Sequence, residues 1–446
     1  MLDFFLIIIF CVLGVLLGII TGLLPGLHVN NVALIMLSLS SSIVGMLHPL
    51  LDYGISEQFI LIVIAGFMIS VSISHSFHDT IPTTFIGAPE EDTALSVLPA
   101  HALLLKGEGY KAVALAALGS YGAILICLAF LYPLRFIIGP PLLLYTTIRE
   151  IMIWILLGVT ILMLATEKAR IVDLGTNGRL PSLLGITFAT FVFLLSGVFG
   201  LLVFHFHLQS PVGVPAPVLF PALVGLFGFP TLLNSLFTKP EIPEQKVAPL
   251  TQNRIEQKST YFSILTGSLA GIFVSIIPGL TTATGTVLAM NARQKSSQEQ
   301  TIVTLSSVNT AAAFSVTVML FVILRARSGV TLAVREIIVI EPWDSVVLPL
   351  GLTYLLMFLL LSGALSYFLT LYLGKLFAKK FNKLPYQTLV VITLLFIFIL
   401  VILFTGILGV VILLVATSIG LLPICWGVRR SHCMGILLIP IILYFL

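Results

Sequence analysis

Residues 14–31 read Gly14-Val15-Leu16-Leu17-Gly18-Ile19-Ile20-Thr21-Gly22-Leu23-Leu24-Pro25-Gly26-Leu27-His28-Val29-Asn30-Asn31, and this stretch decides the fold. It is an apolar segment with a glycine at every fourth position that ends in Pro-Gly. The pattern returns at one constant offset (267 − 14 = 253). The matching positions of the second copy are Gly267, Gly271, Ser275, Pro278, Gly279 and Leu280. Six recurring positions predict two copies of one unit, each opening with a broken helix.

The composition indicates a membrane protein. Hydrophobic residues make up 59% of the chain and charged residues 9%, whereas a soluble domain carries about 25% charged residues. No Asp, Glu, Lys or Arg occurs between Asp3 and Asp52. As one helix that run would be about 70 Å long at ~1.5 Å per residue, more than twice the ~30 Å hydrocarbon core. The chain must therefore fold back, and Pro25-Gly26 is the expected turn.

The remaining compositional signals exclude several other classes of protein. The start has no basic region of the kind that opens a signal peptide, so we expect the first segment to be retained. The four cysteines have no CxxC spacing, and the Cys425–Cys433 segment lacks a fourth metal ligand nearby. The net charge of +4 is small. The basic residues of the chain lie in loops between the apolar segments, which indicates membrane orientation rather than a nucleic-acid-binding patch.

Hydropathy predicts an all-α polytopic membrane protein of roughly 10–12 segments. We predict an N-terminal transmembrane repeat over 1–237, an exposed linker over 238–259 and a C-terminal repeat over 260–446. The linker carries prolines and four Lys or Arg residues, so we place it in the cytoplasm. The predicted apolar segments are 4–24, 29–47, 58–74, 112–137, 148–166, 182–204, 216–237, 260–291, 301–324, 345–373, 386–408, 409–423 and 433–446.

Each Pro-Gly turn predicts a site between two half-helices. Proline removes a backbone donor and glycine permits the turn, so a new helix starts inside the membrane with unpaired N–H groups. Such a start favours anions, and secondary transporters use two of them, one from each repeat. The residues assigned to this substrate or ion site are Pro25, Gly26, His28, Asn30, Asn31, Pro278, Gly279, Thr281, Thr282 and Thr284. The alternative is that Pro-Gly only kinks two helices, with Asn and Thr as caps, and we expect the glycine ladders themselves to serve packing.

A second group of polar residues occupies 70–92. This stretch is too polar to face lipid and too rich in Pro and Gly for one helix, so we expect irregular backbone lining a cavity. His75, His78 and Asp79 are candidates for a proton relay or substrate contact, unless they lie at the water interface. Glu90-Glu91-Asp92 would bind a cation or cap a surface loop.

Arginines 325, 327 and 335 fall on the side opposite the basic linker in this span count, against the positive-inside tendency. Arg325 would neutralise an anionic substrate there or snorkel at a span end. The other explanation is an error in the span count.

At these motifs the sequence resembles the TctA family, the large membrane subunit of tripartite tricarboxylate transporters, and within it the archaeal TctA-like branch. The resemblance rests on both Pro-Gly-Leu segments and on segments spread over nearly the whole chain: 78–82, 87–91, 97–101, 107–110 and 427–435. It implies a permease with inverted repeats that moves a carboxylate coupled to an ion gradient. Bacterial members have a glycine- and serine-rich stretch where this chain has Ser74 to Asp79, so tricarboxylate specificity does not transfer. A need for a small subunit and a binding protein does not transfer either.

Two functions follow from the half-helix pair. The first is a secondary transporter for an organic anion such as a di- or tricarboxylate, coupled to Na⁺ or H⁺, and the alternative is a lipid-phosphate (polyprenyl-phosphate) translocase. We expect no enzyme activity, because no Walker A, HExxH or GxSxG pattern occurs. We expect no cofactor and no nucleic-acid partner. The expected partners are a small anionic substrate, membrane lipid and a second copy of the chain in a homodimer. We expect a multi-pass protein of the plasma membrane.

Overall fold

The computed structural model describes residues 2–24, 29–87, 97–167, 179–206, 208–211, 218–238, 243–250, 253–277, 282–291, 297–381 and 386–446. These residues form helices and no strand, which confirms the predicted all-α class. Nine described helices or joined helices are long and apolar enough to cross a membrane, and a tenth crossing results if the bent pair α8 and α9 is one span. The protein is a multi-pass integral membrane protein of the plasma membrane.

The helices of the first half lie close to the predicted segments. They are α1 (Leu2–Leu23), α2 (Val29–Leu47), η1 (His48–Tyr53), α3 (Glu57–His78), α4 (Thr80–Phe85), α5 (Val97–Leu104), α6 (Gly109–Ala129), α7 (Leu131–Ile138), α8 (Leu144–Glu150), α9 (Met152–Ala165), α10 (Arg179–Val203), α11 (Leu219–Leu223), the π-helix η2 (Val224–Gly228) and α12 (Phe229–Thr238).

In the second half, α13 and α15 begin earlier than the predicted segments, whereas α17 and α19 begin later. They are α13 (Arg254–Ile276), α14 (Thr282–Asn291), α15 (Gln298–Val322), α16 (Gly329–Ile337), α17 (Leu350–Phe381), α18 (Tyr386–Trp426), η3 (Arg430–Met434) and α19 (Gly435–Phe445). Helix α18 joins the two predicted segments 386–408 and 409–423. It is interrupted at Gly406, whose φ of 66° is left-handed and suits glycine.

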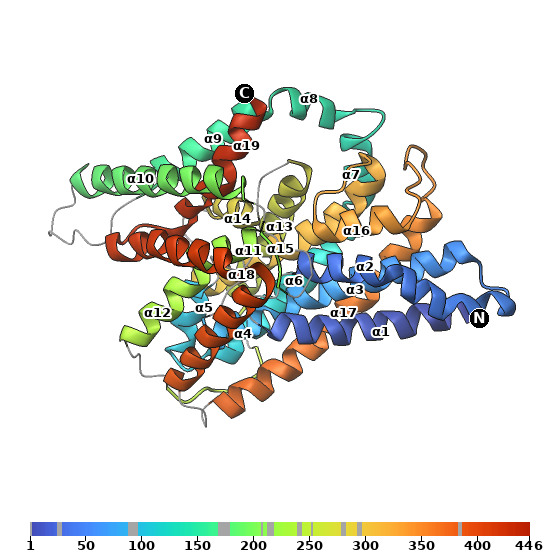
Figure 1. Cartoon of the computed structure of the whole chain (residues 1–446), viewed down its shortest axis with the longest axis horizontal. Coiled ribbons are helices and arrows are strands. Elements are labelled where there is room, and N and C mark those ends of the chain that lie inside the picture. The colour runs from blue at the N-terminus through green and yellow to red at the C-terminus, as the bar shows by residue number, and fades with distance from the viewer. Residues whose placement is uncertain are drawn as a thin grey trace.

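Helices α1 and α3 pack as a close parallel pair, visible as two adjacent blue helices in Figure 1. A Cβ atom on Gly14 would lie 2.8 Å from the carbonyl oxygen of Phe67, and one on Gly18 would lie 2.7 Å from that of Val71. Both residue numbers rise together, so the two helices run in the same direction. The chain between them, which contains α2, therefore returns to the level at which α1 begins, as the predicted hairpin requires.

Helices α13 and α15 repeat this arrangement. A Cβ atom on Gly267 would lie 2.6 Å from the carbonyl oxygen of Thr304, and one on Gly271 would lie 2.4 Å from that of Val308. The partner positions in α3 and α15 also keep one offset (304 − 67 and 308 − 71 are both 237). The offset also matches identical residues of the two helices, Ser70 with Ser307, Val71 with Val308 and Phe77 with Phe314. We interpret α1–α3 and α13–α15 as the two copies of the predicted unit.

The two units enter from opposite sides of the molecule. Glu57 and Gln58 at the start of α3 line one pocket together with Phe321 at the end of α15. Helices α3 and α15 also contact each other. They therefore run antiparallel, which agrees with the inverted orientation expected for the two copies.

The polar stretch from residue 70 onward is helical. We predicted irregular backbone there, but α3 continues to His78 and α4 follows to Phe85, so the described residues 57–85 form one helical span. The prediction failed because buried Ser and Thr hydroxyls bond to carbonyl groups one turn earlier in the helix, as in Thr83 Oγ1 to Asp79 O at 2.7 Å. The stretch is nevertheless buried from Ser74 to Phe85, as its polarity indicated.

The predicted linker is partly docked, not fully exposed. Gln245 is buried, its Oε1 accepts from the backbone N of Gly109 at 2.9 Å, and its Nε2 donates to the carbonyl of Leu104 at 3.1 Å. Helix α13 begins at Arg254, inside the range 238–259. The linker thus closes the start of α6 by supplying an acceptor for an N–H group that the helix itself leaves unpaired.

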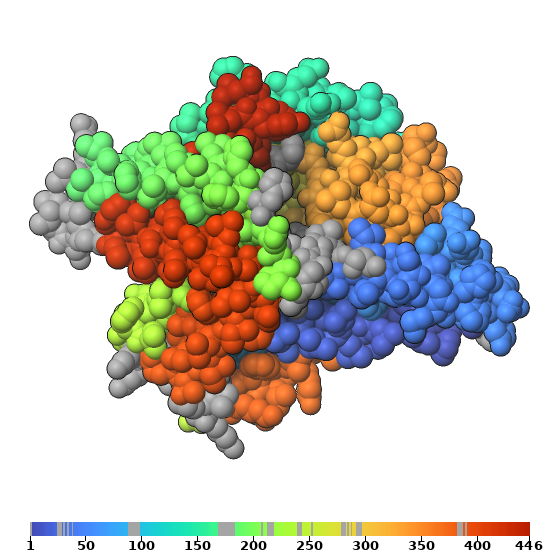
Figure 2. All heavy atoms as spheres, in the orientation of Figure 1, coloured from blue at the N-terminus to red at the C-terminus, as the bar shows by residue number. Residues whose placement is uncertain are grey.

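The described core has two main parts. One gathers α1, α3, α6, α15, α16 and α17, and the other gathers α9, α10, η2, α18 and α19. Figure 2 shows the outer surface of segments from the second part, in green and red, on one flank and of segments from the first part, in blue and orange, on the other.

Candidate functional site

Much of the predicted half-helix site lies outside the described residues. This holds for Pro25, Gly26, His28, Pro278, Gly279 and Thr281, and for the acidic group Glu90, Glu91 and Asp92. Asn30, Asn31 and Thr284 lie within the first turns of α2 and α14, but their side chains are outside the description. Thr282 is described: it is the first residue of α14 and is buried.

The described part of the site is the end of α3, which packs against the end of α1. A Cβ atom on Gly22 would lie 2.8 Å from the carbonyl oxygen of His75, so the two backbones meet closely there. His75 Nδ1 lies 3.1 Å from Thr21 Oγ1. The predicted residues His75, His78 and Asp79 are all buried, which places them inside the protein and away from bulk water.

His78 is held in one orientation. Its Nδ1 donates to the carbonyl of Ser74 at 2.7 Å and lies 3.3 Å from Ser74 Oγ, which itself donates to Val15 O at 2.8 Å. The neutral ring therefore carries its hydrogen on Nδ1, which leaves Nε2 as an acceptor. Within the described residues this fully buried Nε2 has no hydrogen-bond partner. Buried polar atoms are nearly always bonded, so such an atom indicates an unfilled contact.

Both predicted repeats contribute side chains to one buried cluster. Phe77 near the end of α3, Ile276 at the end of α13 and Phe314 of α15 belong to the same buried cluster. Ile277, which follows Ile276, belongs to the second part of the core.

Helix α15 carries polar residues that the sequence analysis passed over as an ordinary span. The buried ones at its centre are Ser306, Ser307, Asn309, Thr310, Ser315 and Thr317. Ser307 Oγ donates to the carbonyl of Gly119 at 3.0 Å and so ties α15 to α6. The signal was available, because so many hydroxyl and amide groups in one span predict a helix enclosed by protein.

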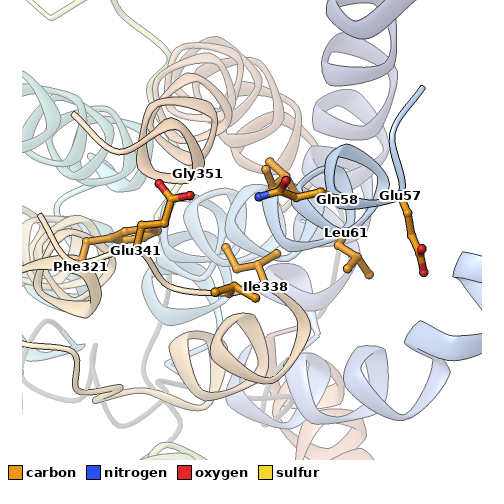
Figure 3. A pocket seen from close by; sticks show the side chains of 9 residues that line it. Glu57, Gln58, Leu61, Phe321, Ile338, Glu341 and Gly351 are labelled. Carbon is orange, nitrogen blue, oxygen red and sulfur yellow. The ribbon is translucent and has the colours of Figure 1, made fainter. Parts of the chain in front are cut away.

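Arg325 does not join this group. It is exposed just after the end of α15, where Glu57 and Gln58 at the start of α3 line a pocket of about 410 Å³ with Phe321, Ile338 and Glu341 (Figure 3). Helix α3 is 22 residues long, so its start and its end are about 30 Å apart at ~1.5 Å per residue. The pocket and Arg325 are therefore remote from His78. In the part of the chain that the structure describes, no group of three His, Cys, Asp or Glu residues is placed to hold a metal.

The chain matches the Tripartite tricarboxylate transporter TctA family over residues 8–435. It belongs to this family. TctA is a family of transporters, not of enzymes, so the chain is a permease of the tricarboxylate-transporter type. Members of the family normally work with a binding protein and a small membrane subunit.

A similar protein is known from an archaeon. An uncharacterized protein of Methanocaldococcus jannaschii is 27% identical over 445 residues, which cover 98% of this chain and 99% of that protein. No solved structure matches the chain. The predicted family is thus confirmed, and the lipid-phosphate alternative receives no support.

Proposed function

We propose that this permease is a secondary transporter for an organic anion of the di- or tricarboxylate class, coupled to Na⁺ or H⁺. The substrate is held between the two half-helix starts, at residues 25–31 and 278–284. The family supplies the general activity, and the location of the site is our own inference.

The observation that carries the location is the paired packing of α1 with α3 and of α13 with α15. Gly18 against Val71 and Gly271 against Val308 place both helix pairs in the same geometry. Phe77 of α3, the helix that packs against α1, and Ile276 at the end of α13 belong to one buried cluster. The antiparallel arrangement of the two copies supports two helix starts that face a common space, where unpaired N–H groups would favour an anion.

Side chains near these ends suit the same ligand. Thr282 places a hydroxyl at the buried start of α14, and His78 places an imidazole at the end of α1. The Thr282 hydroxyl can donate to a carboxylate, and His78 Nε2, as an acceptor, can take a hydrogen bond from a hydroxyl or protonated carboxyl group of the substrate, so neither adds a fixed charge.

Uptake into liposomes tests the proposal. Purified protein is reconstituted, and accumulation of labelled citrate and labelled succinate is measured with an imposed Na⁺ gradient, an imposed pH gradient, and no gradient. We expect one of the two anions to accumulate under one of the gradients. No accumulation of either anion under any gradient contradicts the proposal.

A variant pair then tests the location. Thr282→Val keeps the volume but removes the hydroxyl, and we expect weaker substrate binding, seen as a higher KM. Thr238→Val is the matched control, because Thr238 is exposed at the end of α12 and bonds only to the carbonyl of Asn234 among the described contacts. Equal KM values for the two variants would argue against Thr282 in the site.

A further inference from the structure

A buried acid–base pair lies outside the site described above. His432 Nε2 lies 2.6 Å from Glu167 Oε2, and Arg429 Nε lies 2.6 Å from the same oxygen. The side chain of His432 is 0% exposed and that of Glu167 is 4% exposed, while Arg429 is 31% exposed. We call Glu167, Arg429 and His432 the Glu167 cluster.

The cluster lies at the level of the middle of a membrane span. Ser196 Oγ of α10 donates to the carbonyl of His432 at 3.3 Å, and a Cβ atom on Gly435 would lie 2.1 Å from the carbonyl oxygen of Phe193. Phe193 is the midpoint of the span Leu183–Val203 (193 − 183 and 203 − 193 are both 10). Ionisable groups at this depth are costly and are usually retained for function.

The hydrogen positions of His432 follow from its contacts. The carboxylate of Glu167 can only accept, so neutral His432 carries its hydrogen on Nε2 and donates it to Glu167. Its Nδ1 is then a free acceptor, and among the described residues this buried atom has no partner. The buried Ser431 Oγ next to it in the chain is likewise unbonded within the described part. An incoming proton therefore has a defined place on Nδ1.

The other groups around the cluster do not occupy this place. Arg430 directs Nη1 to Thr231 Oγ1 and to the carbonyl of Phe227 at 3.4 Å, away from Glu167. The elements packed against η3 are α10, α14, α18 and α19. Their described titratable side chains, with those of η3 itself, are Cys425, Cys433, Tyr444 and the residues already named. When His432 is neutral, the charged groups here are the carboxylate of Glu167 and the guanidinium groups of Arg429 and Arg430.

The cluster also adjoins the second half-helix start. Segment η3 packs against α14, and Cys433 and Met434 share a core with Ile277, the last described residue before Pro278. A proton added to His432 raises the positive charge beside α14. That charge favours an anion at the helix start, and by linkage a bound anion favours the proton.

We infer that Glu167 and His432 form the proton site that couples the pH gradient to anion transport. A proton from water binds Nδ1 of neutral His432, and the carboxylate of Glu167 stabilises the resulting imidazolium. On release the proton returns to water. The only bond that forms and breaks on the protein is the Nδ1–H bond. Arg429 is the partly exposed member of the cluster, with 31% of its side chain exposed. This inference rests on the proposed function and names its coupling ion as H⁺.

The first test observes the proton directly and needs no substrate. Protein with ¹⁵N-labelled histidine is studied by NMR in detergent between about pH 5 and 8, the range in which histidine ordinarily changes charge. His432→Gln serves only to assign the resonance. We expect His432 Nδ1 of the wild-type protein to gain a proton within this range, and Glu167→Gln to move its midpoint to lower pH. A His432 ring in one protonation state throughout overturns the inference.

The second test measures coupling with citrate as the probe. In liposomes, Glu167→Gln should reduce uptake driven by a pH gradient by about an order of magnitude, within the usual range of coupling between two sites, while leaving exchange of internal for external citrate in place. Glu150→Gln is the matched control, because Glu150 is an exposed carboxylate at the end of α8. Unchanged pH-driven uptake in Glu167→Gln contradicts the inference.

The two tests separate the two claims. If wild-type protein moves neither citrate nor succinate, the proposed function fails and the NMR titration still decides the proton site. If uptake follows a Na⁺ gradient and His432 does not titrate, the proton site fails and the transport function stands.

Discussion

Gly271 of α13 lies so close to Val308 of α15 that a Cβ atom on the glycine would be 2.4 Å from the valine carbonyl oxygen. Gly18 and Val71 meet in the same way in the first unit. Close backbone approach through small residues is a common way for helices to associate in a membrane, where no water drives apolar faces together. The glycine ladder is therefore the structural basis of each helix pair.

The first prediction concerns this contact. Gly271→Leu forces α13 and α15 apart and should lower stability by about 1–3 kcal/mol, the usual cost of overpacking. Gly158→Leu is the control, because a Cβ atom on Gly158 of α9 meets nothing within 4 Å. The thermal midpoint is measured in detergent by size-exclusion chromatography of heated samples. It should fall for Gly271→Leu and not for Gly158→Leu. Equal midpoints would show that the close approach is unimportant.

The second prediction concerns the imidazole at the end of α3. His78→Ala removes the buried Nε2 that we assign to substrate or ion contact, so the KM for the transported anion should rise while the protein still inserts. His205→Ala is a matched control, because His205 Nδ1 likewise bonds to the carbonyl four residues earlier, at 2.6 Å, but the side chain is exposed. If both variants transport like the wild type, His78 is structural.

The third prediction concerns the docked linker. Gln245→Ala removes the acceptor of the Gly109 N–H and the donor to the carbonyls of Leu104 and Pro243, and should cost about 1–3 kcal/mol. Limited proteolysis should then cut near residue 245 faster than in the wild type. Lys246→Ala is the control, because its side chain is exposed and its backbone N still donates to Gly107 O at 2.8 Å. Identical cleavage rates for the two variants would contradict the docking.

The fourth prediction concerns a surface ion pair that joins the two halves. Lys111 Nζ lies 2.5 Å from Glu299 Oε1, with side chains 33% and 30% exposed. Because water screens a pair of this exposure, Lys111→Met should change stability by only about 0–1 kcal/mol. Glu167→Gln, in contrast, leaves Arg429 without its buried partner and should be more destabilising. The reverse order of thermal midpoints would be inconsistent with this view of the two pairs.

The sequence predicted the general fold from strong, local signals. The charge-free run after Asp3 required a chain that folds back. The recurring glycines predicted close helix contacts, but the helices that they contact, α3 and α15, are known only from the structure. The helical continuation through His78 was missed because the polarity of Ser, Thr and His was read as irregular backbone, whereas those hydroxyls bond within the helix.

The Glu167 cluster could not be predicted for a different reason. Glu167 and His432 are 265 residues apart, and neither belongs to a motif with fixed spacing. Arg429 and Arg430 entered the sequence analysis only as part of segment 427–435, on which the family resemblance partly rests. Their partners, Glu167 and Thr231, come from other helices, so only the packing of α9 and α12 against the C-terminal segments brings them together.

The central claim is that two interrupted helices hold the anion, and the double variant Pro25→Ala with Pro278→Ala tests it most directly. Alanine restores a continuous helix at both turns and removes the exposed N–H groups. The measurement is exchange of labelled for unlabelled substrate in liposomes, compared with Pro423→Ala, which removes a proline inside α18. We predict that the double variant inserts but exchanges no substrate while the control retains exchange. Wild-type exchange in the double variant would contradict the account.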